Sequence, residues 1–295
     1  LNQNCALAIK EIKNRVDIPL VADIHFDYRL ALKAIDCGVD ALRLNPGNIG
    51  GIEHTKLVVN KAKKNNIPIR IGINGGSLEK YLYGESSMTL ADKMVKSALD
   101  NIKILEESDF NLIKVSLKSS SVMNMIEAYR KIYELIPYPL HLGVTEAGTL
   151  RSGIIKSAIG IGSLLSQGIG DTIRVSLTDN PIKEIDCAKE ILSALELRDF
   201  GIEFVSCPTC ARTQIDLIKI TREIKKRCQA TGNINKKIKV AVMGCAVNGP
   251  GEARDADIGI AGGKNSGLIF KHGVIIKKVR EHDLVDELIK QIDLL

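Results

Sequence analysis

Two short segments late in the chain carry cysteines at a spacing that can hold a metal centre. The first is Cys207-Pro-Thr-Cys210, and the second begins at Cys245 and runs through Asn-Gly-Pro-Gly to Glu252. Cysteines three residues apart can direct both sulfurs at one centre, and the proline between them favours a turn over a helix. The third cysteine follows a strand-like run, and turn residues then bring Glu252 back toward it. We therefore expect Cys207, Cys210, Cys245 and Glu252 to be ligands of one metal centre.

The ligand types indicate which metal such a centre would hold. A structural zinc site usually adds a second Cys-x-x-Cys or a histidine pair, and neither follows Cys245. Three thiolates suit a [4Fe-4S] cluster, in which each sulfur binds a different iron, and the Glu252 carboxylate could hold the fourth iron and yield to substrate. A zinc site, or thiols that bind no metal, stay open as alternatives. The cysteines without a partner at chelating distance are interpreted as packing residues or bystanders: Cys5, Cys37, Cys187 and Cys228.

The upstream part of the chain alternates strand-like and helical patterns. Apolar, β-branched runs predict strands at residues 19–24, 41–44, 67–73, 112–117, 139–144 and 172–177. Helical patterns follow them at residues 28–36, 52–64, 89–107, 122–135, 154–167 and 182–195, and another covers residues 5–15. This βα alternation predicts a parallel sheet, either in a β/α barrel or in a doubly wound open sheet.

Polar residues gather near the C-terminal end of each predicted strand, mostly at spacings of two or four, which place them on one face. In a parallel barrel this is the mouth where active sites lie, and Arg and Lys from four strands suit an anion with several oxygens, such as a diphosphate. The candidate substrate-binding residues are Arg43, Asn45, Arg70, Asn74, Lys114, Ser116, Thr145, Arg174 and Ser176. Asp23, His25 and Glu146 are candidates for proton transfer, with orientation of the substrate as the milder interpretation. The pattern also includes Lys118 and His141, to which it assigns no role.

The pattern changes near residue 199 and predicts two domains, residues 1–199 and 200–295. In the second, strands are expected at 202–206, 238–243, 257–261 and within 268–279, helices at 214–227 and 283–292, and a polar loop at 229–237. Gly259 to Lys264 resembles a phosphate-binding loop but lacks the glycine six residues before the lysine, so we interpret it as a turn between strands. Gly160-x-Gly162 is interpreted as a site of close helix packing.

Composition narrows the class of protein. The chain has 295 residues, 45% of them hydrophobic, and 41 basic against 35 acidic residues without a basic block, which argues against nucleic-acid binding. No apolar run reaches the length of about 18 to 20 residues that a membrane span needs. Seven cysteines without framework spacing suit a reducing compartment, so the cytoplasm is expected.

Longer motifs resemble one enzyme family. Residues 206–212 and 243–252 look like the cluster-binding signatures of the 4-hydroxy-3-methylbut-2-enyl diphosphate synthases, iron-sulfur enzymes of the non-mevalonate isoprenoid pathway. Further stretches resemble that family in its order, over essentially the whole chain: Val21-Ala-Asp-Ile-His-Phe-Asp-Tyr28, Leu42-Arg-Leu-Asn-Pro-Gly-Asn-Ile-Gly50, Ile67-Pro-Ile-Arg-Ile-Gly-Ile-Asn74 and Gly168-Ile-Gly-Asp-Thr-Ile-Arg-Val-Ser176.

The resemblance implies a TIM-type β/α barrel, with its first two βα units missing from this sequence, followed by a smaller α+β domain that carries a [4Fe-4S] cluster. It implies reductive ring opening of 2-C-methyl-D-erythritol 2,4-cyclodiphosphate to 4-hydroxy-3-methylbut-2-enyl diphosphate, a two-electron reduction with loss of water. The barrel cations would bind the cyclic diphosphate, and an electron donor such as flavodoxin or ferredoxin would supply the cluster. A homodimer is also implied, with the cluster domain of one subunit closing over the barrel of its partner.

Two other functions remain to be distinguished at this point. One is a non-catalytic, zinc-stabilised binding module on an open α/β scaffold, which iron and sulfide analysis would separate from an iron-sulfur enzyme. The other is a barrel iron-sulfur enzyme that binds S-adenosylmethionine. That class generally has three clustered cysteines near the start of the barrel, and this sequence has none there.

Overall fold

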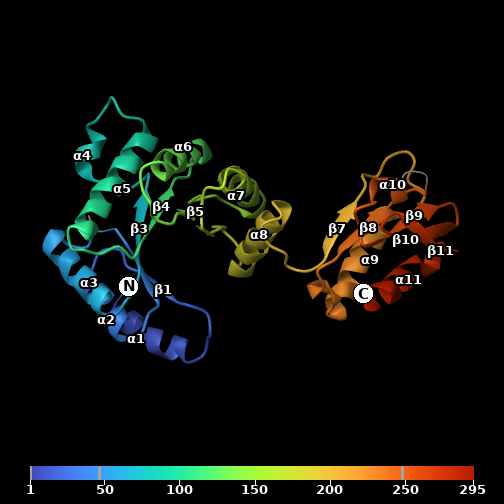
Figure 1. The fold of residues 1–295 in the computed structure, drawn as a ribbon, viewed down its shortest axis with the longest axis horizontal. Coiled ribbons are helices and arrows are strands. Elements are labelled where there is room, and N and C mark those ends of the chain that lie inside the picture. The colour runs from blue at the N-terminus through green and yellow to red at the C-terminus, as the bar shows by residue number, and fades with distance from the viewer. Residues whose placement is uncertain (1, 46–47, 247–248) are drawn as a thin grey trace. The chain divides into compact units, whose positions relative to one another are not determined.

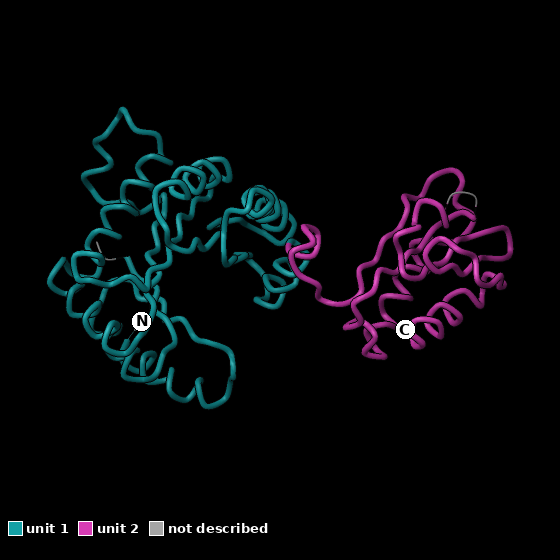
Figure 2. The backbone as a smooth tube through the Cα atoms, in the orientation of Figure 1, with its two compact units in different colours: residues 1–191 teal, residues 192–295 magenta. Residues whose placement is uncertain are grey.

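The computed structural model describes residues 2–45, 48–246 and 249–295 (Figure 1). The chain forms two compact units, residues 1–191 and residues 192–295, which Figure 2 distinguishes by colour. Unit 1 contains a four-stranded and a two-stranded sheet, and unit 2 contains a five-stranded sheet. No helix among the described residues combines the length and apolar character needed to cross a membrane.

Unit 1 alternates short parallel strands with helices. Four strands form a parallel sheet in the order β1-β2-β3-β4, β5 pairs in parallel with β6, and a single parallel bridge from Val115 to Leu140 connects β4 to the segment before β5. The strands are β1 (Val21–Asp23), β2 (Ala41–Leu44), β3 (Ile69–Asn74), β4 (Ile113–Lys118), β5 (His141–Leu142) and β6 (Thr172–Ile173). The helices are α1 (Gln3–Lys13), α2 (Tyr28–Asp36), α3 (Ile52–Lys64), α4 (Lys80–Tyr83), α5 (Leu90–Glu106), α6 (Val122–Tyr133), α7 (Leu150–Leu165) and α8 (Pro181–Ala194).

The two faces of the sheet in unit 1 differ sharply in chemistry. Along β3, Ile69, Ile71 and Ile73 are almost fully buried, and Leu42 and Leu44 of β2 are buried in the same way. Successive side chains of a strand point to opposite faces, so these apolar side chains occupy one face and the polar residues between them occupy the other. The fold therefore leaves one row of polar and charged side chains free for function.

The expected βα alternation and parallel sheet are confirmed, and the predicted bounds of α2, α3 and β2 match the structure. The predicted strands at 139–144 and 172–177 are too long, because after Leu142 the chain leaves the ladder and the Thr145 amide donates to the Ser119 carbonyl. Helix α4 lies outside the predicted helices. No pairing joins β1 to β6 among the described residues, so barrel closure stays a prediction.

Two predictions about small packing residues in unit 1 also have an outcome. A Cβ atom built on Gly160 would lie 2.8 Å from a methyl carbon of Val144 and 2.9 Å from the terminal carbon of Met125, so close packing explains this glycine. Gly162 has nothing within 4 Å of such an atom, and close packing does not explain it. Cys37 and Cys187 are buried, as expected of packing residues.

Unit 2 is a five-stranded mixed sheet with helices on its faces. The strand order is β11-β10-β9-β8-β7, in which β7, β8 and β9 are parallel and β9, β10 and β11 form antiparallel pairs. The strands are β7 (Glu203–Ser206), β8 (Lys239–Met243), β9 (Ile258–Gly263), β10 (Ser266–Lys271) and β11 (Val274–Arg280). The helices are α9 (Leu217–Ala230), α10 (Gly249–Glu252) and α11 (Leu284–Asp293), with 3-10 turns at Asn233–Asn235 and Glu281–Asp283.

Separate apolar clusters form on the two faces of the unit 2 sheet. Ile224 and Cys228 of α9 and Leu288 of α11 are completely buried in the larger cluster. On the other face, Met243 and Phe270 pack with four alanines in a smaller cluster near α10. Because most side chains in this cluster are small, α10 and the segment that leads into it lie directly against the ends of β8 and β9.

Four predictions for unit 2 are corrected by the structure. Gly259 to Gly263 belong to β9 and are not a turn, which instead forms at Lys264 and Asn265. The turn expected after Cys245 is a short helix, α10, while Asn248 of that stretch lies outside the described residues. Helix α9 starts later than residue 214, because the Asp216 side chain accepts the Lys219 amide as an N-cap. The polar loop at 229–237 is partly helical.

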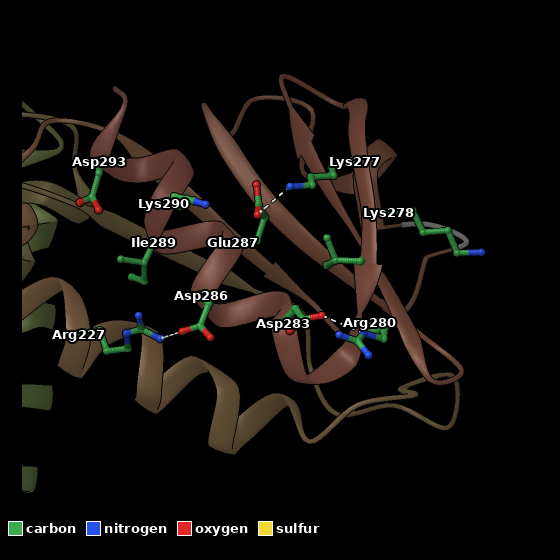
Figure 3. A pocket seen from close by; sticks show the side chains of 11 residues that line it. Arg227, Lys277, Lys278, Arg280, Asp283, Asp286, Glu287, Ile289, Lys290 and Asp293 are labelled. Carbon is green, nitrogen blue, oxygen red and sulfur yellow. Dashed lines mark hydrogen bonds and ion pairs between the residues drawn. The ribbon is translucent and has the colours of Figure 1, made fainter.

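A charged groove of about 650 Å³ lies between α9, β11 and α11 (Figure 3). Its cations and anions pair with one another: Lys277 lies 2.8 Å from Glu287, Arg280 lies 3.1 Å from Asp283, and Arg227 pairs with Asp286. Three of the five cations that line the groove pair in this way with three of its four acidic residues, so the groove carries little net charge, and we interpret the pairs as surface ion pairs.

Candidate functional site

Four predicted site residues form one row across the sheet of unit 1. Asp23 pairs in register with Arg43, Arg43 with Arg70, and Arg70 with Lys114. Residues directly opposite on parallel strands point to the same face, so the four side chains lie side by side. The strand spacing puts about 5 Å between neighbouring strands, which is within the reach of a single diphosphate group.

Arg43 is held in place by contacts from both sides. Its Nη1 lies 3.0 Å from the Asp23 carboxylate, and its Nη2 donates to the Gly72 carbonyl at 3.2 Å. A Cβ atom built on Gly72 would lie 2.2 Å from the Arg43 Nε, so the guanidinium passes over a backbone that carries no side chain. The absence of a side chain at residue 72 is therefore a condition for this arginine conformation.

The row continues into a cluster of buried cations. Lys118 is 7% exposed, and its pKa is lowered to about 7 because burial penalises the ammonium ion and because Arg174, Arg70 and Arg43 repel it, while Asp23 opposes the shift. Burial likewise lowers the pKa of Arg70. Placing like charges close together and away from water costs free energy unless an anion binds beside them. The cluster is therefore suited to a negatively charged ligand.

His141 lies beside this cluster as a neutral imidazole. Its Nδ1 is 2.9 Å from the Thr172 hydroxyl, and burial, followed by repulsion from Arg70 and Lys118, lowers its pKa to about 2. The Tyr129 hydroxyl accepts the Leu117 amide and donates to the His141 carbonyl, so it connects β4 to β5 where no ladder forms. At neutral pH, His141 is uncharged, so one ring nitrogen can donate a hydrogen bond and the other can accept one.

Three buried polar atoms on these strands have no hydrogen-bond partner among the described residues. They are Arg70 Nε, Asn74 Oδ1 and His141 Nε2. Buried polar atoms are nearly always hydrogen-bonded, so three such atoms next to a cluster of cations indicate a site that a polar ligand or water fills. We regard this combination as the strongest structural sign of a binding site in unit 1.

The other predicted residues of unit 1 differ in how far they join the cluster. Ser116 is satisfied internally, because its hydroxyl donates to the Ile71 carbonyl at 3.3 Å, and Asn45 is buried at the end of β2. Thr145 and Ser176 are half-buried in the segments after β5 and β6, and Arg174 is exposed although its charge acts on Lys118. His25 is exposed next to Phe26. Glu146 is exposed and has a φ of 51°, a left-handed conformation that costs a non-glycine residue about 1–2 kcal/mol.

Two residues of the cluster had no role assigned from sequence. Lys118 and His141 stand at the centre of the buried charges, and the strand-end pattern contained both. Their spacing gave no indication that both are buried, each 7% exposed, while Lys114 is only half-buried. A count of positive charges converging from neighbouring strands could have distinguished Lys118.

In unit 2, the predicted metal ligands come from the ends of two neighbouring parallel strands. Cys207 directly follows β7 and Cys245 follows β8, and these strands pair in register up to Ser206 and Val242. The Gly244 amide donates to the Cys207 sulfur at 3.1 Å. Cys245 is 9% exposed, whereas Cys210 lies at the surface. Two strand ends thus present three thiols at one edge of the sheet.

The loop after Cys210 is fixed to the second of these strand ends. The Thr213 amide donates to the Cys210 carbonyl at 3.0 Å, and the Gln214 amide donates to the Gly244 carbonyl at 2.9 Å. The backbone amide and then the side chain of Arg212 lower the pKa of the Cys210 thiol by hydrogen bonding. Hydrogen bonding to Cys210, and then the charges of Cys210, Cys245 and Glu252, raise the pKa of Arg212.

Among the described residues, no three side chains of His, Cys, Asp or Glu are close enough together to hold a single metal ion. This spacing is compatible with a cluster, because each thiolate of a cubane binds a different iron and the ligands stand farther apart than around one ion. The Thr213 Oγ1 atom is buried, lies 2.8 Å from a Cβ atom built on Gly244, and helps to lower the pKa of Cys210 by hydrogen bonding, so a hydroxyl lies beside the cysteines. Three cysteines with N–H donors and an arginine form a donor set that fits an iron-sulfur cluster.

Comparison with known proteins agrees with both units. The family described as the GcpE TIM-barrel domain matches residues 1–189, and the GcpE protein C-terminal domain matches residues 203–294. A protein of Clostridium acetobutylicum named 4-hydroxy-3-methylbut-2-en-1-yl diphosphate synthase (flavodoxin) is 60% identical over 98% of this chain and 82% of its own length. Proteins with the same name from Clostridium tetani and Clostridium perfringens are each 61% identical, over 97% and 99% of this chain and 81% and 83% of their own lengths. The resemblance read from the motifs is confirmed.

Proposed function

This chain belongs to the GcpE family of 4-hydroxy-3-methylbut-2-enyl diphosphate synthases, oxidoreductases of isoprenoid biosynthesis, and we propose that its unit 1 cations bind the diphosphate of the substrate. The observation that carries this assignment is the row of Asp23, Arg43, Arg70 and Lys114, together with the unpartnered polar atoms beside it. Guanidinium and ammonium groups form the strongest hydrogen bonds to phosphate oxygens. The zinc-stabilised binding module is not supported by the comparisons.

The residues of unit 1 would have different roles in substrate binding, according to their charge and position. Lys118 is buried, Arg70 is half-buried, and the two repel each other, so an arriving diphosphate relieves an unfavourable charge cluster. Arg43, fixed by Asp23 and by the Gly72 carbonyl, would orient one phosphate group. Asn74 and the neutral His141 would hydrogen-bond the substrate through the atoms that now lack partners. Asp23, His25 and Glu146 stay candidates for proton transfer or hydroxyl contacts, and Asn45, Ser116, Thr145, Arg174 and Ser176 for lining the site.

In unit 2, Cys207, Cys210 and Cys245 would hold a [4Fe-4S] cluster, with Glu252 as the ligand of the fourth iron. Such a cluster, when bound, supplies electrons one at a time to a substrate that needs two. The Gly244 amide donates a hydrogen bond to the Cys207 sulfur, and hydrogen bonding from Arg212 lowers the pKa of Cys210. The protein itself therefore stabilises negative charge on these two sulfurs.

The partners of this reaction follow from the same assignment. The names of the relatives include flavodoxin, which makes flavodoxin the proposed electron donor here. All seven cysteines are free thiols, which suits work in the reducing cytoplasm. We also expect a homodimer, which analytical ultracentrifugation of the cluster-loaded chain would test.

An anaerobic turnover assay tests the proposed function. The full chain, purified without oxygen, should convert 2-C-methyl-D-erythritol 2,4-cyclodiphosphate to 4-hydroxy-3-methylbut-2-enyl diphosphate when reduced flavodoxin is supplied, with the product identified by mass spectrometry. Arg70→Ala should weaken substrate binding ten- to hundredfold, since a charge-assisted hydrogen bond is worth about 1.5–3 kcal/mol. Arg29→Ala is the matched control, because Arg29 is exposed and paired with Asp27 outside the row. A cluster-loaded chain that forms no product, or zinc without acid-labile sulfide, would refute the proposal.

A further inference from the structure

Tyr129 has the largest fully buried side chain among the described residues, and its hydroxyl lies between two strands of unit 1. The residue belongs to α6, the helix that follows β4. Its hydroxyl accepts the Leu117 amide of β4 at 2.9 Å and donates to the carbonyl of His141, the first residue of β5. Burial raises the pKa of Tyr129, so the hydroxyl keeps its proton at neutral pH and remains a donor.

The hydroxyl takes the place of a ladder hydrogen bond between β4 and β5. These segments begin a regular parallel pairing, in which the Val115 amide donates to the Pro139 carbonyl at 2.9 Å. Because such bonds recur every two residues along each strand, the next pair would be the Leu117 amide and the His141 carbonyl. Tyr129 bonds both of these groups instead. The inserted oxygen therefore holds the strands farther apart than a direct bond would, since a direct N···O distance is about 2.9 Å.

The residues next to this widened pairing belong to the candidate binding site. Lys118 directly follows Leu117 in β4. A Cβ atom built on Gly143, two residues past His141, would lie 3.4 Å from the Lys118 Cε atom and 3.6 Å from its Nζ atom. The end of the lysine side chain thus lies over the segment that continues β5. The Nε2 atom of His141, on the same segment, is buried and has no hydrogen-bond partner among the described residues.

We propose that Tyr129 is a positioning residue for the substrate site: its hydroxyl sets the separation of β4 and β5, and with it the placement of Lys118 relative to His141. This inference rests on the proposed function, because the placement matters only if both residues bind the substrate. Tyr129 acts through the backbone of the two strands. Without the hydroxyl, the Leu117 amide and the His141 carbonyl would either bond directly, which narrows the site, or stay buried without partners. In both cases the separation is no longer fixed.

Isothermal titration calorimetry with 2-C-methyl-D-erythritol 2,4-cyclodiphosphate, on the full chain purified without oxygen and kept below its melting temperature, tests this role. Tyr129→Phe removes the hydroxyl and keeps the ring. We expect its Kd to rise about tenfold, because misplaced groups lose their alignment with the ligand. In a Lys118→Met background the same substitution should raise the Kd less than about threefold, since one of the two positioned groups is already absent. Tyr138→Phe is the matched control: it removes a hydroxyl that bonds Glu106 before β5 begins, and it should bind like wild type.

A spectroscopic measurement on the unsubstituted chain tests the same role. With the tyrosines labelled with carbon-13 at Cζ, the nuclear magnetic resonance signal of Tyr129 should shift when the substrate binds. The reason is that both hydrogen bonds of its hydroxyl respond to movement of Leu117 and His141. The Tyr138 signal should stay unchanged. A side chain that only filled the core would show no such shift.

The outcomes separate this inference from the assignment on which it rests. A wild-type chain that does not bind the substrate would overturn both. Wild-type binding together with an unchanged Kd for folded Tyr129→Phe would overturn the role of Tyr129 alone, even if the melting temperature falls. A further tenfold loss in the Lys118→Met background would contradict an effect transmitted through Lys118. If Tyr129→Phe does not fold, the labelled wild-type chain decides: a shifted Tyr129 signal supports the role, and an unchanged signal contradicts it.

Discussion

The buried Lys118 makes substrate binding sensitive to pH in a way that can be measured. Lys118 is 7% exposed, and its burial, together with repulsion from Arg174, Arg70 and Arg43, lowers its pKa to about 7 in the absence of a ligand. A bound diphosphate supplies the missing negative charge and returns the pKa toward its usual range. Binding should therefore draw a proton onto Lys118 whenever the solution pH lies above 7.

The magnitude follows from the fraction of Lys118 that is charged before binding. With a pKa of about 7, roughly nine tenths of the molecules carry the proton at pH 6 and roughly one tenth at pH 8. If only the charged form binds, the apparent affinity falls roughly tenfold over this range, or about 1.4 kcal/mol. His141 stays neutral throughout, because its pKa of about 2 lies far below this window. The phosphates of a cyclic diphosphate each carry one strongly acidic group, so the substrate charge does not change either.

Isothermal titration calorimetry at pH 6 and pH 8, in buffers that differ in ionisation enthalpy, gives both the affinity and the number of protons bound. We expect uptake of nearly one proton at pH 8 and of little at pH 6. Lys118→Arg should remove the uptake, because an arginine stays charged throughout, whatever its affinity at pH 6. Lys114→Arg is the control, since it alters the neighbouring lysine on β4 and leaves the Lys118 amine in place. Equal proton uptake by Lys118→Arg and wild type would refute the reasoning.

Three further predictions concern stability and the metal centre. Lys118→Met should raise the melting temperature at pH 7 while weakening substrate binding, because folding no longer has to bury an ammonium group among cations; a lower melting temperature would show that the lysine is stabilising. Cys207→Ser, Cys210→Ser and Cys245→Ser, purified without oxygen, should each lose most of their iron and sulfide, whereas Cys37→Ser and Cys187→Ser should keep theirs; full cluster content in one of the first three variants would remove that cysteine from the site. Glu252→Gln should still assemble a cluster but turn over far more slowly, and its Mössbauer spectrum should lose the distinct iron of the resting enzyme; an unchanged spectrum and rate would assign the fourth iron to another ligand.

The row of cations could be predicted from the sequence, because side chains two residues apart on a strand point to the same face. Arg43, Arg70 and Lys114 could be placed near strand ends on one face, and the register between strands then aligned them. The burial of each side chain could not be predicted from the sequence, because it depends on how the strands and the segments that follow them pack together. Lys118 and Lys114 look alike in sequence, yet Lys118 is the one surrounded by three arginines.

The metal-binding segment shows a similar division. The Cys207 and Cys210 spacing and the strand before Cys245 indicated a common centre, because parallel strands end at the same edge. The short helix α10 was not predicted, since glycine and proline at residues 249–251 are typical of a turn and only tertiary packing against β9 makes the segment helical.

The effect of a substitution at Gly72 should depend on the residue at position 43, although Gly72 itself offers no functional group. Any side chain at this residue would occupy the space of the Arg43 guanidinium, from which its Cβ would lie only 2.2 Å away. In a mutational screen, substitutions at residue 72 would therefore mimic loss of the arginine, although glycine itself offers the ligand no functional group. The two residues form an epistatic pair: once Arg43 is gone, the space above residue 72 is open and a larger residue there becomes neutral for binding. A substitution at either residue by itself should therefore weaken substrate binding.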